Sequence, residues 1–204
     1  MVFGYPRNVR ERRHGPKGYG EYRSHKPWLR DEFEFRCVYC LCRERWFPDG
    51  DDNFSIDHAI PRSEAPELAC TYDNLVYACC QCNAAKQDTI GVPDPCRDPY
   101  GPHLEVRPDG TIRVLTPHGA FLVKACRLDR PKLTEFRRGI LEVFHDLRGR
   151  QGEVPAELLR RFFGFPLNLP DLSRLKPPAG NSRTSGLANS HFARRRRGEL
   201  PETY

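Results

Sequence analysis

The sequence predicts a small α+β fold in which a bound metal ion supplements a modest hydrophobic core. The first observation behind this prediction is a pair of Cys-x-x-Cys motifs, Cys37/Cys40 and Cys79/Cys82. The second is the order of predicted elements between and after these motifs, which runs strand, loop, strand, helix. The third is composition, because only 38% of the 204 residues are hydrophobic, with 19 Pro and 16 Gly. A lean core in a small domain often needs a structural metal.

The strands and the helix of this core are predicted from local patterns. Phe54–His58 alternates apolar and polar side chains, as a short strand does. Leu75–Ala78 is the second short strand. Residues 59–73 between them contain two Pro and no clear period, which predicts a compact loop of the kind that often carries function. Residues 83–88 are helix formers, and Gly91 ends that helix.

The chain after this core predicts a hairpin and two helices. Residues 104–115 form the hairpin, with Pro-Asp-Gly at 108–110 as its turn. Residues 120–125 predict a further strand. Apolar side chains recur on one face from Leu133 to Leu147, so we expect a helix from about 130 to 148. A second, shorter helix is expected over about residues 155–163.

Charge and composition divide the chain into four parts. Residues 1–27 are basic, contain several aromatic side chains and predict a flexible arm. Residues 28–92 form the predicted core and begin with a short helix at 28–36. Residues 93–174 are the extension with the hairpin and helices, and residues 175–204 predict a disordered basic tail. The net charge is +6, and basic ends suit a polyanion such as nucleic acid, although solubility alone is an alternative explanation.

The cysteines indicate a compartment and a metal. No apolar segment at the start resembles a signal peptide, and no stretch approaches the roughly 20 apolar residues of a membrane span. We therefore expect a cytoplasmic protein without membrane contact, in which the nine Cys stay reduced and paired motifs bind metal. Cys42 and Cys80 compete as ligands, but the spacing decides against them. The expected ligands of one structural Zn²⁺ are Cys37, Cys40, Cys79 and Cys82.

A second group of residues offers oxygen and imidazole ligands. Asp57 and His58 are adjacent at the end of the first strand, and Asn83 opens the helix behind the second strand. A neutral His can activate water, while a carboxylate and an amide oxygen suit a hard cation such as Mg²⁺. Asn74 is expected either to fix the His58 ring or to brace the loop. This combination is what phosphodiester hydrolysis requires.

The order of these residues closely resembles the HNH endonuclease family, in its version with zinc knuckles. The resemblance covers about residues 28–90, and it implies a ββα-metal fold. The motifs that carry the resemblance are Cys37-Val-Tyr-Cys40, Ile56-Asp-His-Ala-Ile-Pro61, Asn74-Leu-Val and Cys79-Cys-Gln-Cys-Asn83-Ala-Ala-Lys86.

The resemblance implies a role for each matching position. The general base corresponds to His58, and the metal-binding carboxylate corresponds to Asp57. The Asn that orients the catalytic His or its loop corresponds to Asn74. The last position corresponds to Asn83, a metal ligand in place of the more usual His. The implied reaction is hydrolysis assisted by one Mg²⁺, Mn²⁺ or Ni²⁺, which leaves 5′-phosphate and 3′-hydroxyl ends.

Arg62 and Lys86 are candidate phosphate contacts, with solvated surface charges as the alternative. The chain departs from the family by placing Leu41, where glycine is often found, directly after the first knuckle.

The expected function is a metal-dependent endonuclease, with DNA as the first substrate and RNA as the alternative. A non-catalytic, zinc-stabilised nucleic-acid-binding module and a structural zinc protein are the competing hypotheses. Residues 93–174 are a candidate surface for a protein partner.

Overall fold

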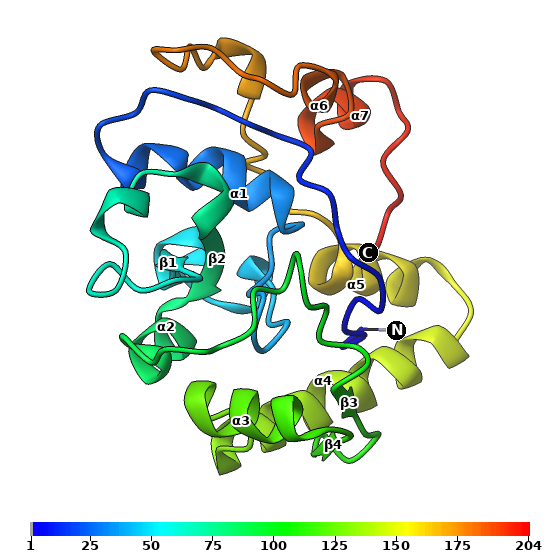
Figure 1. The fold of residues 1–204 in the computed structure, drawn as a ribbon. Helices are drawn as coiled ribbons and strands as arrows, with labels where there is room; N and C mark the ends of the chain where they lie inside the picture. The colour runs from blue at the N-terminus through cyan, green and yellow to red at the C-terminus, as the bar shows by residue number, and fades with distance from the viewer. Residues whose placement is uncertain (1) are drawn as a thin grey trace.

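The computed structural model describes residues 2–204 and has the mixed α+β fold that the sequence predicts. Strand β1 (Phe54–His58) pairs antiparallel with β2 (Leu75–Cys79), and Phe54 lies opposite Cys79. Helix α2 (Cys80–Lys86) follows β2 without an intervening loop. The predicted order of strand, loop, strand and helix is therefore confirmed (Figure 1).

The β1/β2 sheet lies at the centre of the hydrophobic core. All five residues of β2 are buried, and the Phe54 ring stacks on Tyr77 with ring centroids 5.1 Å apart. Helix α1 (Lys26–Glu32) packs against β2, and α2 packs against β1 (Figure 1). A sheet of only two strands is marginal alone, so these helices and the segments around them supply much of its burial.

The extension after α2 is mostly as predicted, with one error. The hairpin is formed by β3 (Leu104–Val106) and β4 (Ile112–Val114), and the helices are α4 (Pro131–Gly149) and α5 (Glu153–Phe163). The predicted strand at 120–125 is wrong, because this segment belongs to helix α3 (Pro117–Cys126). Its start has strong helix signals: the Thr116 side chain accepts a hydrogen bond from the Gly119 amide, and Pro117 follows as the first helical residue.

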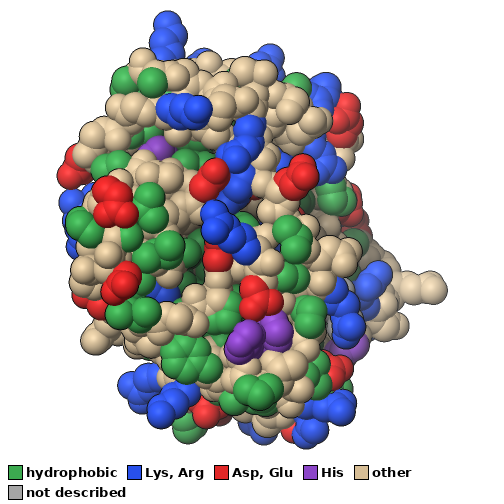
Figure 2. Space-filling view, viewed as in Figure 1, with side chains coloured by type: hydrophobic (Ala, Val, Ile, Leu, Met, Phe, Trp, Pro, Cys, Tyr) green, Lys and Arg blue, Asp and Glu red, His purple; other side chains and the backbone are tan. Residues whose placement is uncertain are grey.

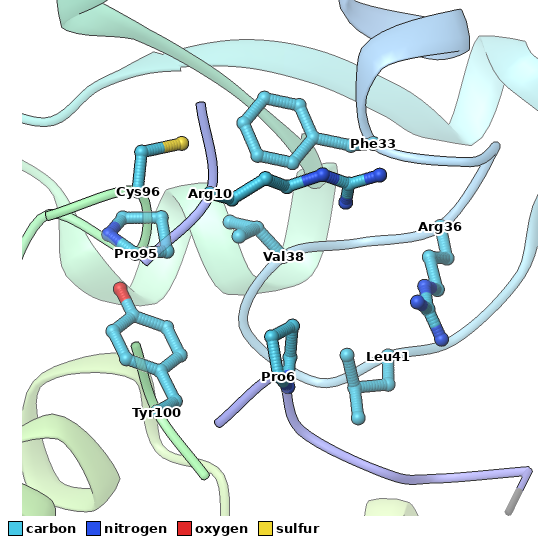
Figure 3. Close-up of a pocket in the computed structure, with 9 residues that line it drawn as sticks. All are labelled: Pro6, Arg10, Phe33, Arg36, Val38, Leu41, Pro95, Cys96 and Tyr100. Atoms are coloured by element: carbon cyan, nitrogen blue, oxygen red, sulfur yellow. The ribbon is translucent and has the colours of Figure 1, made fainter. Parts of the chain in front are cut away.

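The N-terminal segment is packed against the core, in contrast to the flexible arm that composition predicts for residues 1–27, of which residue 1 lies outside the described range. Val2 and Phe3 are buried, and the Tyr5 hydroxyl donates a hydrogen bond to the Tyr39 carbonyl at 2.7 Å. Figure 3 shows Pro6 and Arg10 of this segment beside Phe33, Val38 and Tyr100 around one pocket. Phe3 and Tyr5 are thus core residues, which the composition of the segment alone could not indicate.

The C-terminal segment is also ordered, in contrast to the disordered tail predicted for residues 175–204. It contains α6 (Ser185–Ala188) and α7 (His191–Arg196), which lie near α1 in Figure 1. The Asp31 carboxylate of α1 is fully buried, and it contacts His14 Nε2 at 2.8 Å and His191 Nδ1 at 2.9 Å. A buried carboxylate requires such partners, so Asp31 holds both ends of the chain in place.

The electrostatics of Asp31 agree with this arrangement. Burial alone raises the pKa of its carboxyl, but hydrogen bonds from His14 and His191 hold that pKa well below its ordinary value. The His191 amide adds a further hydrogen bond to Asp31 Oδ1 at 2.8 Å. The carboxylate is therefore charged at neutral pH.

Among the helices of residues 2–204, none combines the length and the apolar character needed to cross a membrane.

Candidate functional site

The four predicted zinc ligands meet at one buried point. The Sγ atoms of Cys37, Cys40, Cys79 and Cys82 all lie within 4.8 Å of one another, and the Cys40 and Cys79 sulfurs are 3.7 Å apart. Zn–S bonds of about 2.3 Å in a tetrahedron place sulfurs roughly 3.8 Å apart, so these side chains fit a structural Zn²⁺. Cys80 is exposed and lies outside the cluster, as the spacing predicts.

Local backbone geometry forms the first knuckle. The Leu41 amide donates to the Cys37 carbonyl at 2.9 Å, and the Cys37 amide donates to the Cys42 carbonyl at 2.8 Å. Leu41 has a φ of +63°, the left-handed conformation that favours glycine. This is the position at which the chain departs from the glycine often found in the resembling family. The turn is kept, with the strain of a left-handed leucine in place of glycine.

Arg130 is a neighbour of the cluster that the sequence analysis missed. Its guanidinium nitrogens lie 3.7 Å and 3.8 Å from Cys82 Sγ. Four thiolates around one Zn²⁺ leave a net negative charge, which a nearby guanidinium offsets. Arg130 directly precedes α4, so the extension contributes to the environment of the metal cluster. No local pattern could reveal this contact, because the two residues are far apart in sequence.

His58 is held in one tautomer by the loop between β1 and β2. Its Nε2 lies 3.0 Å from the Ala69 carbonyl oxygen. Because a carbonyl oxygen only accepts, Nε2 carries the proton of the neutral ring and Nδ1 keeps its lone pair. The Tyr22 ring packs edge-on against the imidazole with centroids 5.0 Å apart. Burial lowers the pKa of His58 from its ordinary value of 6.5, and the nearby Arg62 charge adds to this effect.

Asn74 braces the loop rather than the His58 ring. Its Oδ1 accepts from the Ile60 amide at 2.8 Å, and its Nδ2 donates to the Ile60 carbonyl at 3.0 Å. A longer bond of 3.4 Å joins Nδ2 to the Leu68 carbonyl. Leu68 precedes the residue whose carbonyl holds His58. Of the two roles considered from the sequence, the structure places Asn74 in the second, so its effect on the imidazole is indirect.

Asp57 faces α2, where its carboxylate contacts Lys86. Its carboxylate is buried and accepts from the Tyr39 hydroxyl at 2.6 Å. Lys86 Nζ lies 3.3 Å from Asp57 Oδ1 and donates to the His58 carbonyl at 2.9 Å. Lys86 is only 1% exposed and its ammonium is already paired, so the phosphate contact at this residue stays a prediction. A buried ammonium is stable here because Asp57 neutralises it.

Asn83 lies in α2 against β1, and Arg62 lies in the loop after β1. The Asn83 amide donates to Ser55 Oγ at 2.8 Å, and Ser55 projects from the same face of β1 as Asp57. Asn83 and Asp57 therefore share the β1/α2 interface. Arg62 is exposed in the loop, with its guanidinium 5.4 Å from the centroid of the Tyr22 ring. It is thus available to a ligand that approaches His58.

The cysteine cluster, the β1/β2/α2 unit and the braced loop together have a counterpart among known families. Residues 37–89 match the HNH endonuclease family model. This matched range, which we call the HNH segment, contains both Cys-x-x-Cys motifs and the whole β1/β2/α2 unit. It covers well under half of the chain. The match indicates a nuclease-type function in general. Neither the curated proteins nor the solved structures include a significant match to the chain.

Replacing Asn74 of the HNH segment with alanine tests the bracing role. We expect the Ile60 amide to lose its partner, which costs about 1–3 kcal/mol locally, and any cleavage rate to fall about 100-fold as His58 shifts. Hydrogen exchange at the Ile60 amide and a nuclease assay measure the two effects. The control is Asn8→Ala, at an exposed asparagine of the N-terminal segment. Unchanged exchange at Ile60 would contradict the role.

Proposed function

We propose that the chain is a metal-dependent endonuclease that hydrolyses phosphodiester bonds of nucleic acid, with DNA as the first substrate. The observation that carries this proposal is the fixed tautomer of His58, whose Nδ1 lone pair is free while Nε2 is held by the Ala69 carbonyl. The match of residues 37–89 to the HNH endonuclease family supports the same class of reaction. The deciding experiment is a nicking assay on plasmid DNA with added divalent ions.

In this proposal His58 takes a proton from the water that attacks phosphorus. A general base must be neutral at the working pH, and burial lowers the pKa of His58, which favours its neutral form. Because Nε2 donates to the Ala69 carbonyl, the growing positive charge on the ring is shared with that oxygen. The loop that Asn74 braces keeps this geometry before substrate arrives. A preorganised base needs little rearrangement during the reaction.

Asp57 and Asn83 would hold the divalent ion. A carboxylate and an amide oxygen are hard donors that suit Mg²⁺ or Mn²⁺, and both residues line the β1/α2 interface. Such an ion would polarise the phosphate and stabilise the leaving oxygen. Lys86 now neutralises the Asp57 carboxylate, so ion binding requires the ammonium to withdraw from Oδ1. The chain thus has an internal cation that competes with the metal.

Nucleic acid would approach through basic side chains on the surface. Arg62 is the exposed cation closest in sequence to His58, and it remains our candidate for a phosphate contact. Arg13 and Arg183 line a groove between the N-terminal segment and α6. Figure 2 shows Lys and Arg side chains gathered in the middle of the viewed face. Each phosphate contact releases counterions, so binding is expected to weaken with salt.

The role of Lys86 is tested by Lys86→Met, which removes the charge and keeps an unbranched side chain. Breaking one half of a buried ion pair costs about 3–5 kcal/mol, so the Tm without added ion should fall. Added Mg²⁺ should then raise the Tm of the variant more than that of the wild type, because the ion faces no competing ammonium. Thermal melts with and without Mg²⁺ measure both effects. Lys132→Met, at an exposed lysine of α4, is the control.

The same melts separate the proposal from its alternative, a non-catalytic, zinc-stabilised nucleic-acid-binding module. The Lys86–Asp57 contact favours that alternative, since a neutralised carboxylate has less need of an ion. If Mg²⁺ shifts the Tm of neither protein and no divalent ion supports cutting, the binding module is the better description.

The reduced thiols of the cluster favour the cytoplasm as the compartment. Residues 28–92 carry the proposed chemistry, and residues 93–174 stay our candidate for protein contacts.

A further inference from the structure

A second group of metal-binding side chains lies outside the HNH segment, on the surface formed by the β3/β4 hairpin and α3. Asp98 comes from the loop before β3, His103 directly precedes β3, and His118 lies in the first turn of α3. Their donor atoms all lie within 4.8 Å of one another. Figure 2 shows two histidine side chains next to each other, beside acidic side chains, on the viewed face.

We propose that Asp98, His103 and His118 bind a divalent transition-metal ion such as Zn²⁺. His103 Nε2 lies 2.7 Å from Asp98 Oδ1, and His118 Nδ1 lies 3.6 Å from Asp98 Oδ2. Ligand atoms around one Zn²⁺ are roughly 3 to 4.2 Å apart, given bonds of about 2.0–2.2 Å to nitrogen and oxygen. The separations of the three side chains, all within 4.8 Å, are close to this range, so small shifts would let them share one ion.

The surroundings of His103 hold its ring in the orientation that this ion requires. Its Nδ1 lies 2.7 Å from Thr116 Oγ1. When the neutral imidazole carries its proton on Nδ1 and donates it to Thr116, Nε2 is left with a lone pair directed toward Asp98. A bound cation would take the place of the proton that otherwise joins Nε2 to Asp98 Oδ1 at 2.7 Å. A hydrogen bond from the second ring nitrogen is the usual support of a metal-binding histidine.

The backbone brings His118 to this point through a close approach at Gly119. A Cβ atom at Gly119 would lie 2.3 Å from the His103 carbonyl oxygen, so only glycine permits the contact. The Leu115 amide donates to the same carbonyl at 2.9 Å and fixes the hairpin against the start of α3. These contacts fix His103 against His118, and Asp98 reaches them from the loop before β3.

The donor set differs in kind from the buried cysteine cluster. Two imidazoles and one carboxylate suit Zn²⁺, Ni²⁺ or Cu²⁺, whereas four thiolates enclose a structural ion completely. The His118 side chain is 69% exposed and Asp98 is 39% exposed, so the remaining coordination positions face solvent. An ion bound there keeps water or accepts an external ligand.

The experiment is a calorimetric titration of Zn²⁺ into the full chain after the cysteine cluster has been loaded and its zinc content measured. We expect one additional equivalent to bind. His118→Ala should weaken this binding by more than about 10-fold, and Asp98→Asn should do the same by removing the charge. His145→Ala, at an exposed histidine of α4, is the matched control and should bind as the wild type does.

Two outcomes overturn the proposal: uptake of no zinc beyond the cysteine cluster, or an extra equivalent that His118→Ala and Asp98→Asn both retain. Thr116 provides a second test because its hydroxyl supports His103 and also caps α3. Thr116→Ser should keep the affinity and Thr116→Val should lower it about 10-fold, with melting curves confirming that both variants fold. The site is separate from the proposed catalytic residues, so His118→Ala should leave any nuclease activity unchanged.

Discussion

Cleavage of plasmid DNA in the presence of Mg²⁺, Mn²⁺ or Ni²⁺ is expected to fall at least about 100-fold when His58 is replaced by alanine. A general base contributes roughly 10²- to 10⁴-fold to a rate, and no neighbouring side chain can replace the Nδ1 lone pair. The fold should persist, because the variant loses one hydrogen bond to the Ala69 carbonyl and one ring contact with Tyr22. Initial rates of nicking measure the effect.

Two further variants separate the base from its structural contacts. His58→Gln keeps an N–H donor for the Ala69 carbonyl but has no basic nitrogen, so it should be as inactive as His58→Ala. His145→Ala controls for the loss of an exposed histidine elsewhere. Full activity in His58→Gln would contradict the proposed role and assign the residue to structure alone.

The pH dependence follows from the same residue. Burial lowers the pKa of His58, so the neutral, basic form predominates from below pH 6.5 upward. The cleavage rate should therefore rise with pH through an acidic midpoint below 6.5 and then level off. A midpoint above that value would mean that another group takes the proton.

Replacing Cys79 with serine is expected to unfold the chain at 25 °C. Structural zinc contributes an apparent free energy of about 10–16 kcal/mol in small zinc-binding peptides, and whole domains are stable by only about 5–15 kcal/mol. Cys79 is buried at the junction of β2 and α2, so the loss of its thiolate affects both elements of the core. Zinc content per chain and circular dichroism melting curves measure the result.

Cys80 provides a closely matched control for this experiment. It is the next residue in the chain, it is exposed and it lies outside the cluster. Cys80→Ser should keep the zinc content and the Tm of the wild type. If Cys79→Ser also kept its zinc and its Tm, the cluster would not be the metal site that the geometry indicates.

Local patterns predicted the part of the fold that depends on near neighbours. The alternation of apolar and polar side chains in Phe54–His58 predicted β1, and the spacing inside each Cys-x-x-Cys motif predicted the ligands of the cluster. Both signals involve residues close in sequence, and both predictions are confirmed. The segment at 120–125 was misassigned because a short apolar run fits a strand and a buried helix equally well. The decisive signal was at its edge, in Thr116 and Pro117, where a side-chain cap starts α3.

Contacts between distant residues explain the remaining differences. Lys86 looked like a surface cation because its partner Asp57 belongs to another element, and Arg130 gave no sign of its contact with Cys82. The sequence could not choose between the two roles of Asn74, since that choice depends on how the loop folds over Ile60.

The double contact of Asp31 has a consequence for how the chain is made. The ribosome synthesises His14 before Asp31, but His191 becomes available 160 residues after Asp31. During that interval the carboxylate that supports α1 lacks one of its partners, and an incompletely paired buried charge is unfavourable. The HNH segment is complete in sequence at residue 89, yet its supporting helix reaches its final state only after residue 191 has left the ribosome. Completion of the core is therefore coupled to the synthesis of the segment that contains His191.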